Sequence, residues 1–286
     1  MSGQSMPEIL NSRDSILQVF DDFRDELDGH NDRRERLIKS SRDVTNLSKK
    51  VIFLLHRTMT EENFESNDHV LAVRAAGRAK EKLREIQNMF AAIREEVAGD
   101  RFWRYQKNVS PGLQEYIEAL SFAHFLEHGT LISYDEVQQS LCDNNGIRYF
   151  PLPLEDYLLG LSDLTGELMR YAISAISRRG GRSKASEVCT FVRGCRANFE
   201  GLVPYYRELR KKQAVTSQSL EKIEDVAYAI AVRSSEYDLP PEILDDIVAR
   251  TVSSAAYSGS QGDRRRKGGR GSRGHDDELD DGLDED

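Results

Sequence analysis

The chain has 286 residues, 38% of them hydrophobic and 31% charged, which is enough for one large domain or two small ones. The chain has only seven prolines and no recurrent alternating apolar runs, which argues against a sheet protein. It has no apolar stretch near the ~20 residues that a membrane span needs, which argues against a membrane protein. The net charge of −9 disfavours a broadly basic surface, so any nucleic-acid-binding surface must be a local patch.

Apolar residues recur at helical spacing along most of the chain, and this predicts an all-α fold, a bundle of about seven long helices. The first three helices are expected over about residues 12–58, 67–96 and 102–128. The apolar stripe that opens the first helix consists of Ile16, Val19, Phe20, Phe23 and Leu27. Ser133 and Glu136 then form a capping box, which begins a short fourth helix.

The helical pattern resumes after Pro153. It predicts a fifth helix that runs to Ser177, a sixth over 184–202, a seventh over 205–235, and a last short helix from Pro240 to near residue 251. The chain is thus divided into a flexible N-terminus over residues 1–11, a single helical domain over 12–256, and a disordered tail over 257–286.

The tail has a basic half followed by an acidic half. The basic half is either a nuclear import signal or an RNA contact, or it pairs with the acidic half in a solvated segment. The N-terminus lacks the layout of a signal peptide, and three cysteines without a C-x-x-C pair predict reduced thiols, with neither a disulfide framework nor a zinc site. We therefore expect the protein in the cytoplasm and the nucleus.

Four carboxylates stand in two helical segments whose other residues are mostly apolar. Glu115 and Glu118 are separated by i,i+3 in the third helix, and Asp163 and Glu167 by i,i+4 in the fifth, so each pair shares one side of its helix. Neither acidic stretch contains a Lys or Arg, although a buried carboxylate without a counter-charge costs several kcal/mol. Four acids that converge without cations favour a site for Mg²⁺ or Mn²⁺. The alternative is that each pair is solvated, or bridged to cations from another helix.

A site of this kind supports a limited chemistry. Two divalent ions ~4 Å apart would activate water and stabilise the leaving oxygen in phosphodiester hydrolysis. A di-iron bundle is disfavoured, because it would need Glu-x-x-His motifs that the chain lacks. His124 lies on the apolar stripe beyond Glu118, where it is either a proton shuttle or, as the pattern favours, a packed side chain.

Four long segments carry a family resemblance. They are SRDVTNLSKKVIFLLHR (Ser41–Arg57), GLQEYIEALSFAHFL (Gly112–Leu126), DYLLGLSDLTGELMR (Asp156–Arg170) and LEKIEDVAYAIAVRSSE (Leu220–Glu236). In this order they resemble the family of translin-associated factor X, over roughly residues 16–241. The resemblance implies a helical bundle and a Mg²⁺-dependent endoribonuclease that works with translin inside a closed hetero-octameric shell. It further implies cleavage of small-RNA passenger strands and tRNA-precursor fragments.

The resemblance also implies roles for the four acids. The family's Glu-Tyr-x-Glu falls on Glu115 and Glu118, and its Asp-Leu-Thr-Gly-Glu falls on Asp163 and Glu167, so all four are expected to be catalytic and metal-binding. Translin shares the bundle but lacks the second acidic pair. Asp163 and Glu167 therefore make this chain resemble the nuclease rather than its RNA-binding sibling.

RNA binding requires cations, and several clusters supply them. The candidates are Arg33, Arg34, Arg36, Lys39 and Arg42 on the first helix, Arg178, Arg179 and Arg182 at the turn before the sixth, and two smaller groups, Lys49, Lys50 and Arg57, and Arg207, Arg210, Lys211 and Lys212. Such contacts give affinity without sequence readout. The alternative for the first cluster is a solvated face balanced by Asp32, Glu35 and Asp43. A buried site would admit single-stranded RNA more easily than a rigid duplex.

A second functional hypothesis belongs to a different class. The chain would be a non-catalytic scaffold that stabilises translin and binds nucleic acid. Metal dependence separates the two hypotheses, because a scaffold would be indifferent to Mg²⁺ and to the four acids.

Overall fold

The computed structural model describes residues 8–61, 68–176 and 181–236. Within these ranges the regular elements are all α-helices, which confirms the all-α prediction. They are α1 (Glu8–Thr60), α2 (Asp68–Ala92), α3 (Arg101–His128), α4 (Tyr134–Gln139), α5 (Leu154–Ile176), α6 (Gly181–Leu202) and α7 (Arg207–Glu236). The last short helix expected after Pro240 and the tail over 257–286 lie outside the described residues.

Most helices begin and end near their predicted limits. α1 already begins at Glu8, inside the segment predicted to be flexible, and α2 ends at Ala92 and is followed by turns over residues 93–100. The predicted capping box is present, because the Ser133 hydroxyl accepts the backbone N–H of Glu136 while the Glu136 carboxylate accepts the backbone N–H of Ser133. No helix of the described ranges is both long and apolar enough to cross a membrane.

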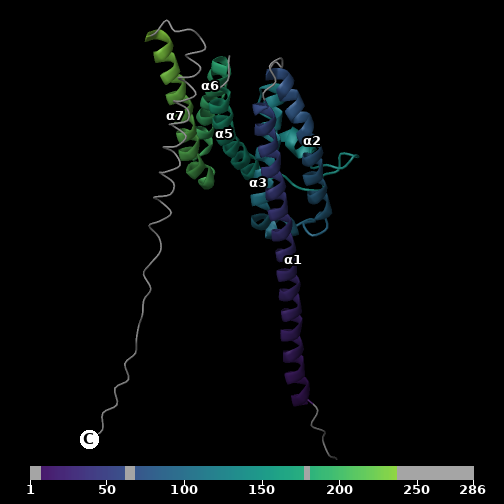
Figure 1. The fold of residues 1–286 in the computed structure, drawn as a ribbon. Helices are drawn as coiled ribbons and strands as arrows, with labels where there is room; N and C mark the ends of the chain where they lie inside the picture. Colours follow the sequence, from purple (N-terminus) through teal and green to yellow (C-terminus); the bar gives the residue numbers. More distant parts are fainter. Residues whose placement is uncertain (1–7, 62–67, 177–180, 237–286) are drawn as a thin grey trace, which may run out of the picture.

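The helices form two groups that share a central contact (Figure 1). α2 packs against α1 and α3, α6 packs against α5 and α7, and α5 also packs against α7. α3 and α5 lie against each other and join the two groups. These two central helices are the ones that carry the four predicted acids.

Two glycines permit the close approach of α3 to its neighbours. A Cβ atom at Gly160 of α5 would lie 2.7 Å from the Cβ of Ile117 on α3. A Cβ atom at Gly112 of α3 would lie 2.7 Å from the backbone oxygen of Ser41 on α1, and the Gly112 N–H donates to the Ser41 hydroxyl at 3.0 Å. Side chains at either position would force the helices apart, because packed interiors leave no room for extra atoms.

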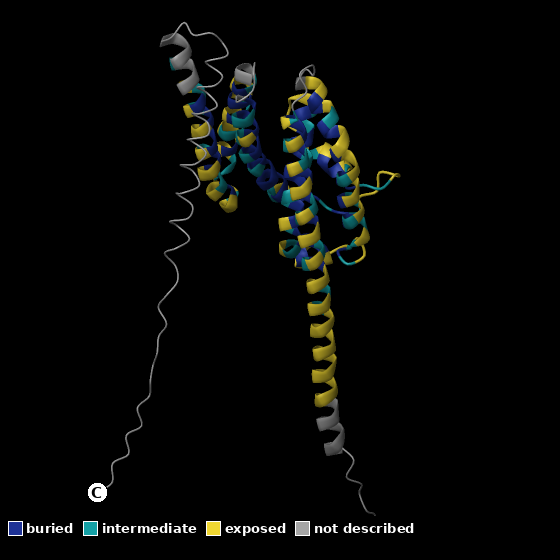
Figure 2. Ribbon diagram, viewed as in Figure 1, coloured by how far each residue is buried: buried dark blue, intermediate teal, exposed yellow. Residues whose placement is uncertain are grey.

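The N-terminal part of α1 projects as an arm from the bundle (Figure 2). Its apolar stripe, Ile16, Val19, Phe20, Phe23 and Leu27, is exposed and does not join the core of the described chain. The core part of α1 begins near Leu37, which is fully buried. A contiguous apolar stripe left in solvent is typical of a surface that contacts another protein.

Candidate active site

The four predicted carboxylates line one cavity. Glu115 and Glu118 reach it from α3, and Asp163 and Glu167 reach it from α5. The cavity has a volume of about 700 Å³ and is lined in addition by side chains of α1 and α7. The packing of α3 on α5 thus brings together two acidic pairs that are far apart in the sequence.

Buried apolar neighbours hold these carboxylates in position. Asp163 and Glu167 directly precede Leu164 and Leu168, which are fully buried, so both acids stand at the edge of the buried stripe of α5. On α3 the fully buried Ile117 directly precedes Glu118. Glu115 and Glu118 are separated by i,i+3, and Asp163 and Glu167 by i,i+4, so each pair shares one face of its helix, and that face opens into the cavity.

Three of the acids have basic partners. Lys49 of α1 lies 3.4 Å from the Glu115 carboxylate, and Lys212 of α7 forms a short ion pair with Asp163. Glu167 accepts two such contacts, one from His56 of α1 and one from Arg170 of its own helix. The expectation of a cation-free cluster was therefore wrong. The two acidic stretches contain no Lys or Arg, but α1, α7 and the next turn of α5 bring cations to the cavity.

Glu118 is the exception. It is 8% exposed, and no described lysine, arginine or histidine forms an ion pair with it. Burial raises the pKa of Glu118 to about 9, and the charges of Asp163, Glu167 and Glu115 add to the effect. The charge of Lys212 opposes the shift only in part, so the Glu118 carboxyl group favours its protonated form unless a cation binds.

The other three acids show how far their partners compensate for burial. Burial raises the pKa of Asp163 and that of Glu115, although Lys212 and Lys49 oppose the shifts. Burial is also the largest single influence on the pKa of Glu167, and it acts to raise that pKa. The hydrogen bond from His56 and the charge of Arg170 together outweigh it, so the pKa of Glu167 is lowered. Glu118 is therefore the one acid of the cavity that has no ion-pair partner among the described residues.

The four carboxyl groups are donors of the type that a hard divalent ion binds. Carboxylate oxygens are the ligands that Mg²⁺ prefers, and the unpaired Glu118 supplies one that is buried and uncommitted. As the side chains stand, no three His, Cys, Asp or Glu residues of the described chain are grouped closely enough to hold a metal ion. To bind a metal ion, Glu115 and Asp163 would have to break their ion pairs with Lys49 and Lys212.

Of the two alternatives for His124, the proton shuttle is not supported by its position. His124 lies outside the cavity lining, and its Nε2 atom is 3.1 Å from the Thr130 hydroxyl. His56 lines the cavity instead. A signal for it exists in the sequence, because Lys49, Phe53 and His56 follow one another at helical spacing on a single face of α1.

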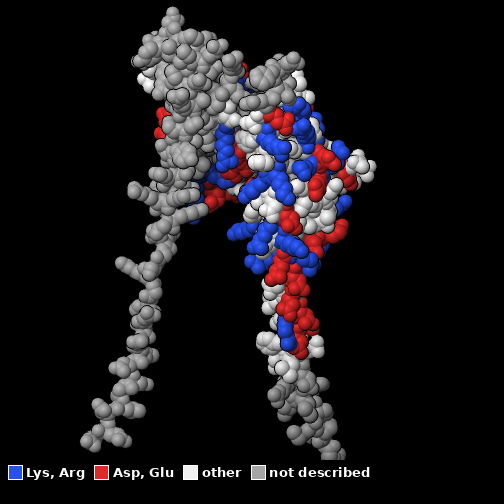
Figure 3. Space-filling model, in the orientation of Figure 1, with Lys and Arg blue, Asp and Glu red and all other residues white. Residues whose placement is uncertain are grey.

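The cations predicted to bind RNA on α1 divide into two sets. Arg33 and Arg36 both pair with Glu96, from the turn after α2, and not with the acids of their own helix. Arg34, Lys39 and Arg42 line a second hollow of about 690 Å³ together with Asp32 and Glu35, and Arg36 is common to both sets because it lines this hollow as well. Figure 3 shows Lys and Arg gathered where α1 meets the bundle, whereas acidic residues dominate its projecting arm.

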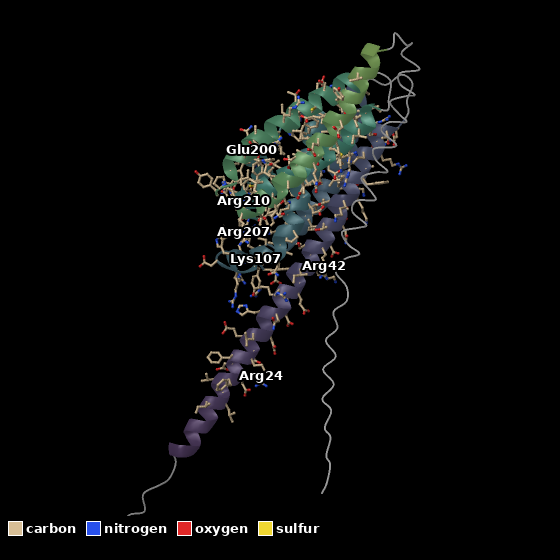
Figure 4. The ribbon with its side chains drawn as sticks, turned by 90° about the vertical axis from the view of Figure 1, so that its left-hand side faces the viewer. Arg24, Arg42, Lys107, Glu200, Arg207 and Arg210 are labelled. Carbon is tan, nitrogen blue, oxygen red and sulfur yellow. The ribbon has the colours of Figure 1, made fainter. Side chains whose placement is uncertain are left out.

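The remaining predicted cations differ in their surroundings. Arg178 and Arg179 lie outside the described residues, as does the side chain of Arg182. On α7, Lys211 pairs with Glu208 and Lys212 turns into the acidic cavity. Arg207 and Arg210 of α7 lie higher in the view of Figure 4 than Arg42 of α1, and all three side chains are exposed. Arg207, Arg210 and Arg42 thus remain candidates for contacts with a phosphate backbone.

Comparisons with known proteins agree on one family. The model of the Translin family matches residues 32–234. The chain is 34% identical over 263 residues to translin-associated protein X of Pongo abelii, which covers 83% of this chain and 85% of that protein. It is 30% identical over 223 residues to a translin-associated protein X homolog of Schizosaccharomyces pombe, with 77% and 90% covered. The crystal structure of AfC3PO has a similar fold, with a TM-score of 0.56 at 19% identity over 75% of this chain and 97% of that one.

Proposed function

The chain belongs to the translin family, and from this premise we propose that it is the catalytic subunit of a Mg²⁺-dependent endoribonuclease. The observation that supports this most directly is the gathering of Glu115, Glu118, Asp163 and Glu167 in one cavity. A scaffold would gain nothing from a buried acid without an ion-pair partner such as Glu118, which costs stability unless a ligand compensates for it.

In this proposal the four acids hold the metal. Mg²⁺ bound there would polarise the scissile phosphate and lower the pKa of a bound water. Glu118 contributes a carboxyl group that forms no ion pair with a described residue. His56 orients the Glu167 carboxylate through its hydrogen bond. Lys49 and Lys212 place positive charge beside the acids, where a phosphodiester would enter.

The proposed partner is translin, in a closed hetero-oligomer. The family supports this partnership, and so does the exposed apolar stripe on the arm of α1, which is suited to burial against another subunit. The proposed substrates are single-stranded RNAs, namely small-RNA passenger strands and tRNA-precursor fragments, in the cytoplasm and the nucleus. Phosphate contacts would come from exposed cations such as Arg42 and Arg207.

The test uses this chain co-expressed with translin. Labelled single-stranded RNA is incubated with the complex in Mg²⁺ and in EDTA, and the assay is repeated with Asp163→Ala after its assembly has been checked by light scattering. We expect cleavage in Mg²⁺, none in EDTA, and none with the variant. RNA binding without cleavage in either condition would instead identify a scaffold, and cleavage that survives Asp163→Ala would remove the carboxylate site from the mechanism.

A further inference from the structure

An aromatic side chain stands exposed at the acidic cavity. Phe53 of α1 is 68% exposed, although it lines the cavity together with the four carboxylates. Its neighbour Ile52 is 8% exposed and supplies the packing of this turn of α1. Phe53 is therefore not needed for the core of the described chain, and its ring faces the space that a substrate would occupy.

The surroundings of Phe53 are those of a nucleotide site. Lys49 lies one helical turn before it, and its side chain is 62% exposed even though its ammonium is 3.4 Å from Glu115. Val215 of α7 also lines the cavity and is 58% exposed. The cavity thus offers apolar surface from two helices, a cation, and the carboxylates proposed to bind metal. A ligand that matches all three has a flat apolar ring joined to an anionic phosphate.

We propose that Phe53 is the stacking platform for one unpaired nucleobase of the RNA, beside the phosphate that is cleaved. Val215 provides further apolar contact for the same base, and Lys49 faces its backbone. The inference rests on the proposed function, since it assumes that RNA enters this cavity. It adds a residue and a source of specificity that the four acids do not provide.

The proposal explains a preference for unpaired RNA. A base in a duplex is already stacked on its neighbours and paired across the helix, so it can reach Phe53 only after it is extruded, which costs a few kcal/mol. A base in a single strand is free to stack, and stacking on an aromatic ring tolerates every base. We therefore expect selection for single strands without sequence readout.

The test measures binding, which does not depend on cleavage. Complexes of the chain with translin carry Phe53→Leu, which keeps the apolar bulk but removes the ring, or Phe53→Trp, which restores a ring. Trp103→Leu is the matched control, because Trp103 is 64% exposed on α3 and lies outside the cavity lining. Affinities are measured in Ca²⁺ and in EDTA for a single-stranded RNA, for the same backbone with abasic riboses, and for a blunt duplex.

We expect Phe53→Leu to weaken binding of the single strand about 5- to 150-fold, with little change for the abasic strand or the duplex. Phe53→Trp and Trp103→Leu should bind like the wild type. Equal affinities of Phe53→Leu and wild type for the single strand would overturn the proposal. An equal loss of affinity for the intact single strand and for the abasic strand would also overturn it. A Phe53→Leu chain that no longer assembles with translin would do the same, because Phe53 would then be a subunit contact.

This binding experiment and the Mg²⁺ cleavage assay together separate the inference from the nuclease proposal. If Phe53→Leu weakens binding of the single strand but the wild-type complex shows no Mg²⁺-dependent cleavage, the base subsite stands and the catalytic role is removed. A complex that cleaves but is indifferent to Phe53→Leu would do the reverse. A wild-type complex that does not bind single-stranded RNA at all would overturn both.

Discussion

The Nε2 atom of His56 lies 2.7 Å from Oε2 of Glu167, so one hydrogen bond ties α1 to the acidic face of α5. His56 is 111 residues away from Glu167 in the sequence, and its ring also packs on Phe122 with centroids 4.7 Å apart. The ring is thus held from two sides. A carboxylate fixed by such a partner keeps one orientation, which matters when the carboxylate is a metal ligand.

We predict that His56→Ala weakens metal binding and cleavage by about 10- to 100-fold, the usual cost of removing the partner of a ligand. The Mg²⁺ concentration that gives half-maximal cleavage measures the effect, and His124→Ala is the control. His124 contacts Thr130 outside the cavity and should leave the Mg²⁺ titration unchanged. Equal Mg²⁺ requirements for His56→Ala and wild type would show that the hydrogen bond does not position Glu167.

A second prediction concerns Lys212, which neutralises Asp163 in the absence of metal. Lys212→Gln leaves a partly buried carboxylate without its counter-charge, so in EDTA the free energy of unfolding should fall by about 1–3 kcal/mol. Mg²⁺ should restore most of that loss, because the divalent ion replaces the missing charge. The melting temperature of the variant should therefore rise more with Mg²⁺ than that of the wild type.

Lys211→Gln is the matched control for Lys212. Lys211 is the preceding residue on α7, and it pairs with Glu208 on the exposed face of the same helix. Exposed pairs contribute little, so its loss should change stability by less than about 0.5 kcal/mol and leave the response to Mg²⁺ unaltered. If both lysine variants respond to Mg²⁺ like the wild type, Lys212 and the metal do not share Asp163.

A third prediction follows from the pKa of Glu118, which burial raises to about 9 from an unfolded value of 4.5. The folded chain keeps a proton that the unfolded chain releases above pH 4.5. The stability from this group is therefore complete below pH 4.5 and is lost as the pH rises towards 9. Glu118→Gln cannot ionise, so in EDTA its stability relative to wild type should increase from pH 5 to pH 8 by a few kcal/mol.

Urea unfolding at pH 5, 6.5 and 8 measures the dependence for Glu118→Gln and wild type. Parallel stability curves would mean that folding does not raise the pKa of Glu118, so that this carboxyl group is ionised in the folded chain at neutral pH. Added Mg²⁺ should reverse the difference, because it stabilises the ionised wild-type carboxylate and has less to bind in the amide variant.

The limits of prediction from this sequence follow from what local patterns encode. The helices and both acidic pairs were predictable, because a period near 3.6 and spacings of i,i+3 and i,i+4 are local properties. The partners of the acids were not, since Lys49, His56 and Lys212 come from helices whose packing on α3 and α5 is set by the whole fold. The apolar stripe of the arm has the spacing of a core-facing stripe but is exposed, because periodicity alone cannot tell a core face from an exposed one.

Aromatic residues illustrate the same limit. Phe102, Trp103 and Tyr105 lie close together at the start of α3, yet Phe102 and Tyr105 are buried while Trp103 is exposed. Phe53 lies inside a run of apolar residues, and only the structure shows that its ring faces the acidic cavity. Neighbouring positions on one helix differ in burial because they point to different sides.

The last prediction concerns Gly160, where α5 touches α3. A methyl group there would lie 2.7 Å from Cβ and Cγ2 of Ile117 and 3.0 Å from the backbone oxygen of Gln114, so α3 would have to shift. Ile117 directly precedes Glu118, and the shift would move the α3 acids away from Asp163. Gly160→Ala should therefore lower the free energy of unfolding by about 1–3 kcal/mol and reduce cleavage at saturating Mg²⁺. Gly194→Ala in α6 is the control, since its methyl group meets nothing within 4 Å and should stabilise the helix by about 0.5–1 kcal/mol. A Gly160→Ala chain as stable and active as the control variant would mean that the α3–α5 contact does not set the spacing of the acids.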